Sequence, residues 1–350
     1  MRVLMTGCDG YIGAVMAPLL EKSGIQVVGL DTCYFAGCTF GDREPRRPAL
    51  RRDLRDVRPE DLSDFDAVIH LAALSNDPLS DLDPECTFDI NHRASVRLAE
   101  LARAAGVERF LYSSSCSVYG AGSADDVLAE DASFDPITPY AKSKVQVEAD
   151  VSKLASDDFS PTFLRNATVY GVSPRLRGDL VVNNLVGWAL TTGRVLLKSD
   201  GTPWRPLVHV EDVSRAFLAV LRAGREVVHN QAFNVGRSGE NYRIRNVADL
   251  VQAALPDSRI DFAEGAGPDP RCYRVDFAKI EAGLPGFRPR WDVAAGVAEL
   301  RDAFRAADLR QEELEGDRYL RIRRIRNLLE AGRLSPDLRW IGTPGTGEAA

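Results

Sequence analysis

The sequence lacks several features that would place it in other protein classes. No uninterrupted apolar run approaches the length of about 18 residues that a membrane-spanning helix needs. The first residues, MRVLMTG, run straight into a strand-like segment without a separate apolar signal region, which predicts a cytoplasmic protein. The six cysteines are scattered, with no CxxC pair and no histidine nearby at zinc-ligand spacing. We therefore expect reduced thiols and no structural metal.

Basic residues are also in deficit. The chain has 44 Lys and Arg against 51 Asp and Glu, which gives a net charge of −7. This balance predicts neither general nucleic-acid binding nor a membrane partner, although local basic patches can still hold phosphates. At 350 residues the chain exceeds the size at which single cores stop growing, so we expect two lobes.

The chain opens with a strand, a glycine turn and a helix. Residues 2–6 form a short apolar strand, GCDGYIG follows, and a helical pattern ends at Gly24 before a second strand closes at Asp31. Three glycines in this turn (Gly7, Gly10 and Gly13) allow a tight bend and a close approach of the backbone to a pyrophosphate. The helix N-terminus would face those phosphates with its positive end. The segment predicts a dinucleotide site.

Asp31 bears on the choice of dinucleotide. A carboxylate at the tip of the second strand can accept hydrogen bonds from the adenosine ribose, and it would repel a 2′-phosphate. This predicts NAD as the cofactor. Three arginines in the following loop, Arg43, Arg46 and Arg47, leave NADP as the alternative.

Further strands and helices alternate along the first half of the chain. Residues 66–74 and 109–115 are strand-like, and the segment 91–106 between them has a helical pattern. This alternation predicts an α/β fold with a Rossmann-type doubly wound parallel sheet, in which ligands lie at the carboxyl ends of strands. Asp53, residues 70–73 and residues 113–120 all lie at such ends. We expect His70 itself to be structural.

The stretch TPYAKSK, residues 138–144, predicts the start of a helix that Thr138 caps. Tyr140 and Lys144 then lie one turn apart on the same face. A neighbouring ammonium favours phenolate, so we expect Lys144 to lower the pKa of Tyr140 and to make it an acid or base. An isolated YxxxK pair is more often a surface lysine beside a half-buried tyrosine, and only the other motifs overturn that interpretation.

Taken together, the motifs resemble the extended short-chain dehydrogenase/reductase family, in particular its nucleoside-diphosphate-sugar epimerases and dehydratases. The matching segments, in family order, are TGCDGYIG, Asp31, RDL, HLAA, Asn91, SSSCSVYG, YAKSK, LRNATVYG, NNL and WRPLVHVEDV. The resemblance implies that Ser115, Tyr140 and Lys144 are catalytic. It also implies a homodimer in which the helices at 91–106 and 139–155 pair across a two-fold axis.

The resemblance and the motifs together predict two sets of binding residues. Asn91 would organise the cofactor side of the site, with a helix N-cap as the alternative. The predicted NAD contacts are Gly7, Gly10, Tyr11, Ile12, Gly13, Asp31, Asp53, Leu54, Leu71, Ala72, Ala73, Asn91, Ser113, Tyr140 and Lys144. Contacts to a nucleoside-diphosphate sugar are predicted for Ser75, Ser115, Cys116, Ser117, Thr168, Asn184, Arg205 and Arg271.

Departures from the family pattern narrow the reaction. The resemblance implies that dehydratases follow the catalytic Ser or Thr with Asp-Glu, whereas Cys116 and Ser117 stand here, so we do not expect 4,6-dehydration. Two reactions remain, C4 epimerisation through a 4-keto intermediate and NAD(P)H-dependent reduction of a 4-keto sugar. We favour the epimerase because Asp31 selects NAD. A non-catalytic NAD-binding protein is the third alternative.

The expected domain boundaries lie where the alternation of predicted strands and helices ends. The NAD-binding domain covers residues 1–171, joined by parts of 206–236, and a smaller substrate-binding lobe covers 172–205 and 237–300. A helical extension at 301–341 carries five arginines: Arg318, Arg321, Arg323, Arg324 and Arg326. We expect it to cover the substrate lobe or to form a subunit contact, with binding of an anionic ligand as the alternative. Residues 342–350 are predicted to be disordered.

Overall fold

The computed structural model describes residues 1–42, 44–45, 48–120, 126–267, 269 and 271–342. Its strands are β1 (Arg2–Thr6), β2 (Gln26–Asp31), β3 (Leu50–Arg51), β4 (Ala67–His70), β5 (Arg109–Ser115), β6 (Val127–Leu128), β7 (Ser160–Asn166), β8 (Thr168–Tyr170), β9 (Arg194–Ser199), β10 (Trp204–His209), β11 (Gln231–Val235), β12 (Asn241–Arg243), β13 (Arg259–Gly267) and β14 (Arg274–Val275). Its α-helices are α1 (Gly13–Lys22), α2 (Asp77–Ser80), α3 (Pro84–Phe88), α4 (Ala94–Ala104), α5 (Pro139–Ser152), α6 (Val181–Thr192), α7 (Val210–Arg222), α8 (Arg225–Val228), α9 (Ile244–Ala254), α10 (Ala278–Gly283), α11 (Val293–Ala306), α12 (Gln311–Leu314) and α13 (Arg321–Glu330). Shorter helical turns are η1 (Leu54–Asp56), η2 (Pro59–Leu62), η3 (Asp89–Arg93) and η4 (Cys116–Tyr119).

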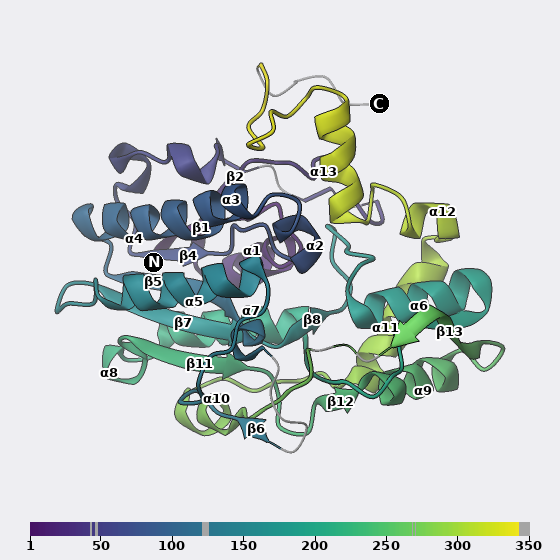
Figure 1. Ribbon diagram of the computed structural model, residues 1–350. Helices are drawn as coiled ribbons and strands as arrows, with labels where there is room; N and C mark the ends of the chain where they lie inside the picture. Colours follow the sequence, from purple (N-terminus) through teal and green to yellow (C-terminus); the bar gives the residue numbers. More distant parts are fainter. Residues whose placement is uncertain (43, 46–47, 121–125, 268, 270, 343–350) are drawn as a thin grey trace.

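The first lobe is built on a parallel sheet. Within the described residues it has seven strands in the order β11-β7-β5-β4-β1-β2-β3. Strand β1 pairs with β2 on one side and with β4 on the other, so the strand order reverses there. This is the crevice where doubly wound sheets bind ligands. The predicted Rossmann-type fold class is confirmed, and the sheet lies in the left half of Figure 1.

Alternating residues of each strand build two separate cores, because successive side chains of a strand point to opposite faces. On one face Val3 and Met5 of β1 pack with residues of α1 and α7. On the other face Leu4 packs with residues of α4 and α5. Figure 1 shows α4 and α5 running side by side along the front of this lobe. The sheet is thus buried on both sides, as parallel sheets usually are.

The second lobe has its own core. Helices α6, α9 and α11 pack together around the paired strands β9 and β13, on the right of Figure 1. The predicted extension contributes to this core as far as Tyr319, through Phe304 and Leu314. A three-stranded sheet of β8, β10 and β12 connects the lobes.

Beyond Tyr319 the chain does not cover the substrate lobe. Ile325, Leu328 and Leu338 pack instead against Tyr34 and Leu79 of the first lobe. In Figure 1, α13 rises beside α2, far from α9. For this part of the extension, the expectation that it covers the substrate lobe was therefore wrong, because the apolar side chains of α13 pack against the first lobe. The expectation of a subunit contact stays a prediction. Of the predicted tail, residues 343–350 lie outside the described residues.

Two global features complete the fold. Among the described residues, no helix has both the length and the apolar character needed to cross a membrane. All six cysteines are free thiols, and five of them are buried.

Candidate active site

A large cavity, of about 1160 Å³, lies between the two lobes. It is lined by the carboxyl ends of the sheet strands, by the start of α5 and by residues of the second lobe. The predicted residues that line it are Gly7, Gly10, Tyr11, Ile12, Gly13, Asp31, Asp53, Leu54, Leu71, Ala72, Ala73, Ser75, Ser113, Ser115, Ser117, Tyr140, Lys144, Thr168, Asn184, Arg205 and Arg271. The fold thus brings into one cavity residues that lie far apart in the sequence.

The glycine turn forms a cradle that only glycine permits. Gly7 has a φ of +73°, and a Cβ there would lie 2.7 Å from the backbone nitrogen of Ala72. A Cβ on Gly13 would lie 2.4 Å from the carbonyl oxygen of Gly7. Helix α1 begins at Gly13, which lines the cavity, so the positive end of the helix dipole lies at the cavity. The turn therefore fits the diphosphate of a dinucleotide.

Asp31 is held at the tip of β2 by backbone groups. Its Oδ1 accepts a hydrogen bond from the N–H of Cys33 at 2.7 Å, and its Oδ2 accepts one from the N–H of Asp9 at 2.9 Å. Burial raises the pKa of this carboxyl group, while those two N–H groups act to lower it. Asp31 lines the cavity on the side where the adenosine ribose of a dinucleotide would lie. Arg43, Arg46 and Arg47, the basis of the NADP alternative, lie outside the described residues.

The residues predicted to be catalytic come together at the start of α5. Thr138 caps the helix by accepting a hydrogen bond from the N–H of Ala141 at 3.2 Å. Lys144 is buried, donates to the carbonyl oxygen of Ser113 at 2.7 Å and lies 5.5 Å from the ring centroid of Tyr140. Ser115 ends β5 beside them. The alternative of a surface lysine is excluded by this burial.

The expected pKa of Tyr140 was wrong in direction. Burial raises it to about 12, against the lowering effects of a hydrogen bond with Ser115 and of the charge of Arg177. Lys144 does not reverse this, because burial also lowers the pKa of its own ammonium to about 7, with the charge of Glu148 acting the other way. Burial thus favours the protonated phenol of Tyr140 and the neutral amine of Lys144.

Two predicted site residues do not line the cavity. Asn91 is buried inside η3 rather than at a helix N-cap, and its side chain bonds both the N–H and the carbonyl oxygen of Leu74, at 2.8 and 3.1 Å. It thus fixes a stretch of backbone that does line the cavity. Cys116 belongs to the core, where its thiol donates to the carbonyl oxygen of Arg165 at 3.1 Å and burial raises its pKa. The first turn of η4 directs Cys116 inward and leaves only Ser117 at the cavity.

The opposite end of the cavity carries the two predicted substrate arginines. Arg205 donates to Asp269 at 2.9 Å, and Arg271 donates to the same carboxylate at 2.8 Å. Arg271 also pairs with Asp77. One carboxylate thus brings two guanidinium groups together, an arrangement suited to a diphosphate because arginine presents paired donors. Asn184 lines the same region and donates to the carbonyl oxygen of Gly178 at 2.7 Å.

Comparison with known proteins identifies the family. Residues 3–236 match the model of the NAD dependent epimerase/dehydratase family. The chain belongs to this family. It is 32% identical to a UDP-glucose 4-epimerase of Mycolicibacterium smegmatis over 321 residues, which cover 87% of this chain and 99% of that protein.

Solved structures agree with this assignment. One is MoeE5 in complex with UDP-glucuronic acid and NAD, which is 29% identical, has a TM-score of 0.75 and covers 88% of this chain and all of that one. Another is the UDP-glucose 4-epimerase of Thermotoga maritima with UDP-glucose, which is 26% identical, has a TM-score of 0.76 and covers 88% of this chain and all of that one. This family member is accordingly an NAD-dependent enzyme of the extended short-chain dehydrogenase/reductase type.

Sequence reasoning missed several cavity residues of this epimerase/dehydratase family member. Arg177 is buried, pairs with Asp179 at 2.8 Å and donates to the hydroxyl of Ser75 at 3.2 Å. Tyr273 also lines the cavity. Nothing in the local sequence of Arg177 or Tyr273 distinguishes them from surface residues, because only the tertiary fold brings them to the cavity. Arg321 lines it as well, and the sequence had named it only as one of five arginines in the extension.

Proposed function

We propose that the protein epimerises a nucleoside-diphosphate sugar at C4 through a transient 4-keto intermediate, using NAD. The observation that carries the proposal is the shared cavity of the glycine turn, the Ser115–Tyr140–Lys144 group and the arginine pair Arg205–Arg271. A dinucleotide cradle at one end and two diphosphate-binding cations at the other leave the reacting sugar between them, beside Tyr140.

The protein's own part in this reaction is to move a proton and to orient the sugar. Bound NAD supplies the hydride acceptor and returns the hydride. Tyr140, supported by the hydroxyl of Ser115, exchanges a proton with the C4 hydroxyl. Because burial raises the pKa of Tyr140, its phenol must first give up its own proton, which the neutral amine of Lys144, with a pKa of about 7, can take up; the phenolate then accepts the proton of the C4 hydroxyl. To invert C4, the 4-keto sugar must present its opposite face before the hydride returns.

The two residues after Ser115 do not fit an enzyme that catalyses 4,6-dehydration of the sugar. Removal of water from the sugar needs an acid and a base at the neighbouring carbon. In this protein Ser117 faces the cavity there and Cys116 is buried in the core. Neither supplies a carboxylate, which supports epimerisation over 4,6-dehydration.

The test uses a panel of nucleoside-diphosphate hexoses, including UDP-glucose and UDP-glucuronic acid, incubated with the purified enzyme without added cofactor. NMR of the products should show a C4 epimer of at least one sugar and no net NADH. Consumption of one reduced cofactor per product would assign the ketoreductase reaction instead. No conversion of any sugar, by a protein that binds NAD, would support the non-catalytic alternative.

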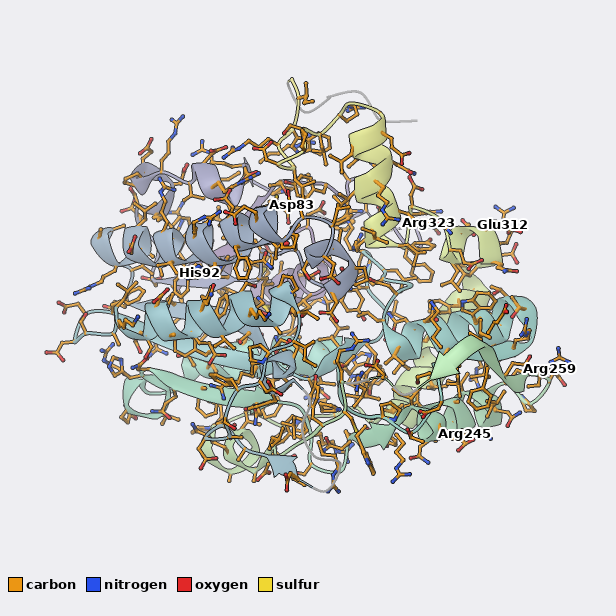
Figure 2. The ribbon with its side chains drawn as sticks, viewed as in Figure 1. Asp83, His92, Arg245, Arg259, Glu312 and Arg323 are labelled. Carbon is orange, nitrogen blue, oxygen red and sulfur yellow. The ribbon has the colours of Figure 1, made fainter. Side chains whose placement is uncertain are left out.

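A homodimer is the quaternary state that we propose. Helices α4 and α5 lie side by side on the outer face of the first lobe, where a second copy could complete a four-helix bundle. At this face His92 of η3, labelled in Figure 2, bonds Asp150 of α5 at 2.8 Å and so ties α5 to the turn that leads into α4. The six free thiols fit a reducing compartment, and we propose that the protein works in the cytoplasm.

A further inference from the structure

The C-terminal strap, defined here as residues 317–341, returns from the second lobe to the wall of the cavity that carries Asp31. The indole N–H of Trp340 donates to the carbonyl oxygen of Thr32 at 2.8 Å. The hydroxyl of Tyr34 donates to the carbonyl oxygen of Leu338. Thr32 and Tyr34 both line the cavity. The strap is therefore bonded directly to the segment that follows β2, where the adenosine half of a dinucleotide would lie.

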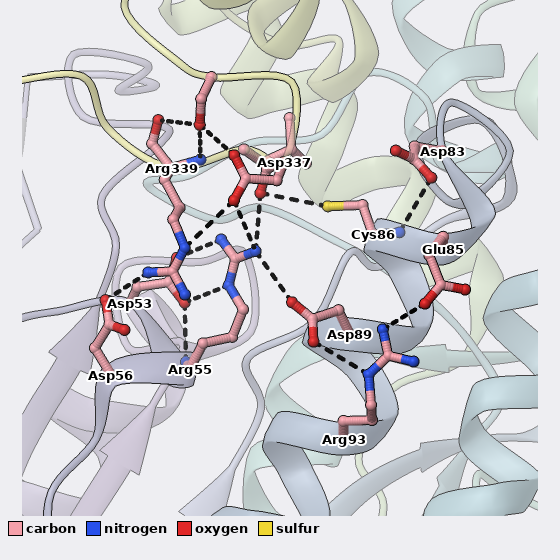
Figure 3. A network of polar contacts seen from close by, with 12 residues as sticks. Asp53, Arg55, Asp56, Asp83, Glu85, Cys86, Asp89, Arg93, Asp337 and Arg339 are labelled. Carbon is pink, nitrogen blue, oxygen red and sulfur yellow. Dashed lines mark hydrogen bonds and ion pairs between the residues drawn. The ribbon is translucent and has the colours of Figure 1, made fainter.

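A second set of polar contacts joins the strap to Asp53, another lining residue. Figure 3 shows that Asp53 holds the side chain of Arg55, at 2.7 Å, and that Arg55 donates to the carbonyl oxygen of Asp337 at 2.9 Å. Beside it, Arg339 of the strap pairs with Asp56 at 2.7 Å. The position of the strap and the shape of this cavity wall are therefore coupled.

Arg321 is the residue that the strap inserts into the cavity. Its side chain is only 3% exposed, its guanidinium carbon lies 3.9 Å from the ring centroid of Phe35, and its Nη2 donates to the carbonyl oxygen of Arg175 at 2.9 Å. Its Nη1 is buried and has no hydrogen-bond partner among the described residues. Leaving one nitrogen of a buried guanidinium without an acceptor is costly, so this geometry favours an acceptor, and best an anion, at Nη1.

The surroundings of Arg321 place that anion at the glycine turn. Arg175, to which Arg321 is bonded, donates with its own guanidinium to the carboxylate of Asp9, within the turn, at 2.8 Å. Arg177, the nearby cation, pairs with Asp179 at 2.8 Å, whereas no ion pair to Arg321 occurs among the described residues. Burial, followed by the charge of Arg177, lowers the pKa of Arg321 to about 10, and the charge of Asp179 acts the other way.

We propose that Arg321 pairs with the diphosphate of the dinucleotide and that the C-terminal strap thereby retains NAD in the enzyme between turnovers. The family match ends at residue 236, so this contact comes from a part of the chain outside it. Retention suits a reaction that returns the hydride within one active site. The proposal concerns cofactor binding alone. Its test measures NAD affinity and NADH release, so its outcome does not depend on which sugar reaction the enzyme catalyses.

The test compares Arg321→Met with Arg323→Met, which removes the same charge from an exposed position of the same helix (Figure 2). Calorimetry measures binding of NAD and of adenosine, which has no diphosphate, and stopped-flow fluorescence measures NADH release. Arg321→Met should weaken NAD binding about 10- to 100-fold, the usual loss for a hydrogen bond to a charged group, and should speed NADH release. Adenosine binding should not change, and Arg323→Met should match the native protein throughout.

Three results would overturn the proposal. NAD affinity in Arg321→Met equal to that in Arg323→Met would show that Arg321 does not contact the cofactor. An equal loss of affinity for adenosine, which has no diphosphate, would show that the substitution had shifted the strap. The loss of NAD affinity would then not be due to the charge of Arg321. A loss confined to UDP, measured with NAD saturating, would assign Arg321 to the substrate. Should Arg321→Met fail to fold, Arg321→Gln, which keeps a donor for the carbonyl oxygen of Arg175, carries the same predictions.

Discussion

At the scale of single residues, Tyr140 is the group on which the proposed chemistry depends. Tyr140→Phe keeps the ring and its packing but removes the oxygen that carries the proton. Turnover should fall about 10²–10⁴-fold, the usual contribution of a general acid or base, while NAD binding and folding survive. Ser115→Ala should lose less, because Tyr140 can still reach the sugar hydroxyl. Steady-state kinetics with calorimetry of NAD binding measure both effects, and near-native turnover in Tyr140→Phe would contradict the mechanism.

Lys144 should leave a signature in the pH dependence of stability. Its pKa is lowered from 10.5 to about 7 by burial, so between these values the unfolded chain binds more protons than the folded chain. The contribution of Lys144 to the free energy of unfolding therefore rises with pH across this window. Lys144→Met should be stabilised relative to the native protein more at pH 7 than at pH 9, as measured by urea unfolding.

The matched control for this measurement is Lys142→Met, on the exposed side of the same helix. It removes the same formal charge without changing a buried group, so its difference from the native protein should be nearly equal at the two pH values. A Lys144→Met difference that is likewise independent of pH would show that the ammonium is not held in a desolvated site.

At the scale of elements, the glycine turn before α1 should tolerate no side chain. A Cβ on Gly13 would lie 2.4 Å from the carbonyl oxygen of Gly7 and 2.6 Å from Cα of Cys8, so the backbone must shift. Gly13→Ala should therefore weaken NAD binding about tenfold or more. Gly283→Ala, where an added Cβ meets nothing within 4 Å, is the control for calorimetry. Unchanged affinity in Gly13→Ala would remove the turn from the cofactor site.

Sequence alone predicted those elements whose function depends on local spacing. The glycine turn precedes α1 within a few residues, and Tyr140 and Lys144 share a face because they lie one helical turn apart. The same locality explains why the capping of α5 by Thr138 was predictable.

Other features depended on long-range packing and could not be predicted. Tyr34 and Leu338, whose contact fixes the strap, are 304 positions apart. The direction of the Tyr140 pKa was misjudged because spacing reveals a neighbouring cation but not the burial that outweighs it. Cys116 shared a motif with lining residues, yet the turn of η4 sends its thiol into the core.

At the scale of the whole molecule, the outer face of α4 and α5 should hold two copies together. Light scattering at micromolar concentration should give twice the mass of one chain. Ala149→Glu, which adds a charge and bulk to an exposed position of α5, should shift the protein toward monomers because like charges would meet near the two-fold axis. Ala282→Glu, exposed on α10, should not. A native protein that is already monomeric would contradict the proposed dimer.

The two lobes, the cradle for the dinucleotide and the arginine pair together imply that one hydride leaves and re-enters the same carbon. The most direct measurement follows deuterium placed at C4 of a nucleoside-diphosphate hexose that the enzyme converts, with no cofactor added. NMR and mass spectrometry should find the C4 epimer with deuterium still at C4. Deuterium lost from C4, or found at another carbon of the product, would contradict the account.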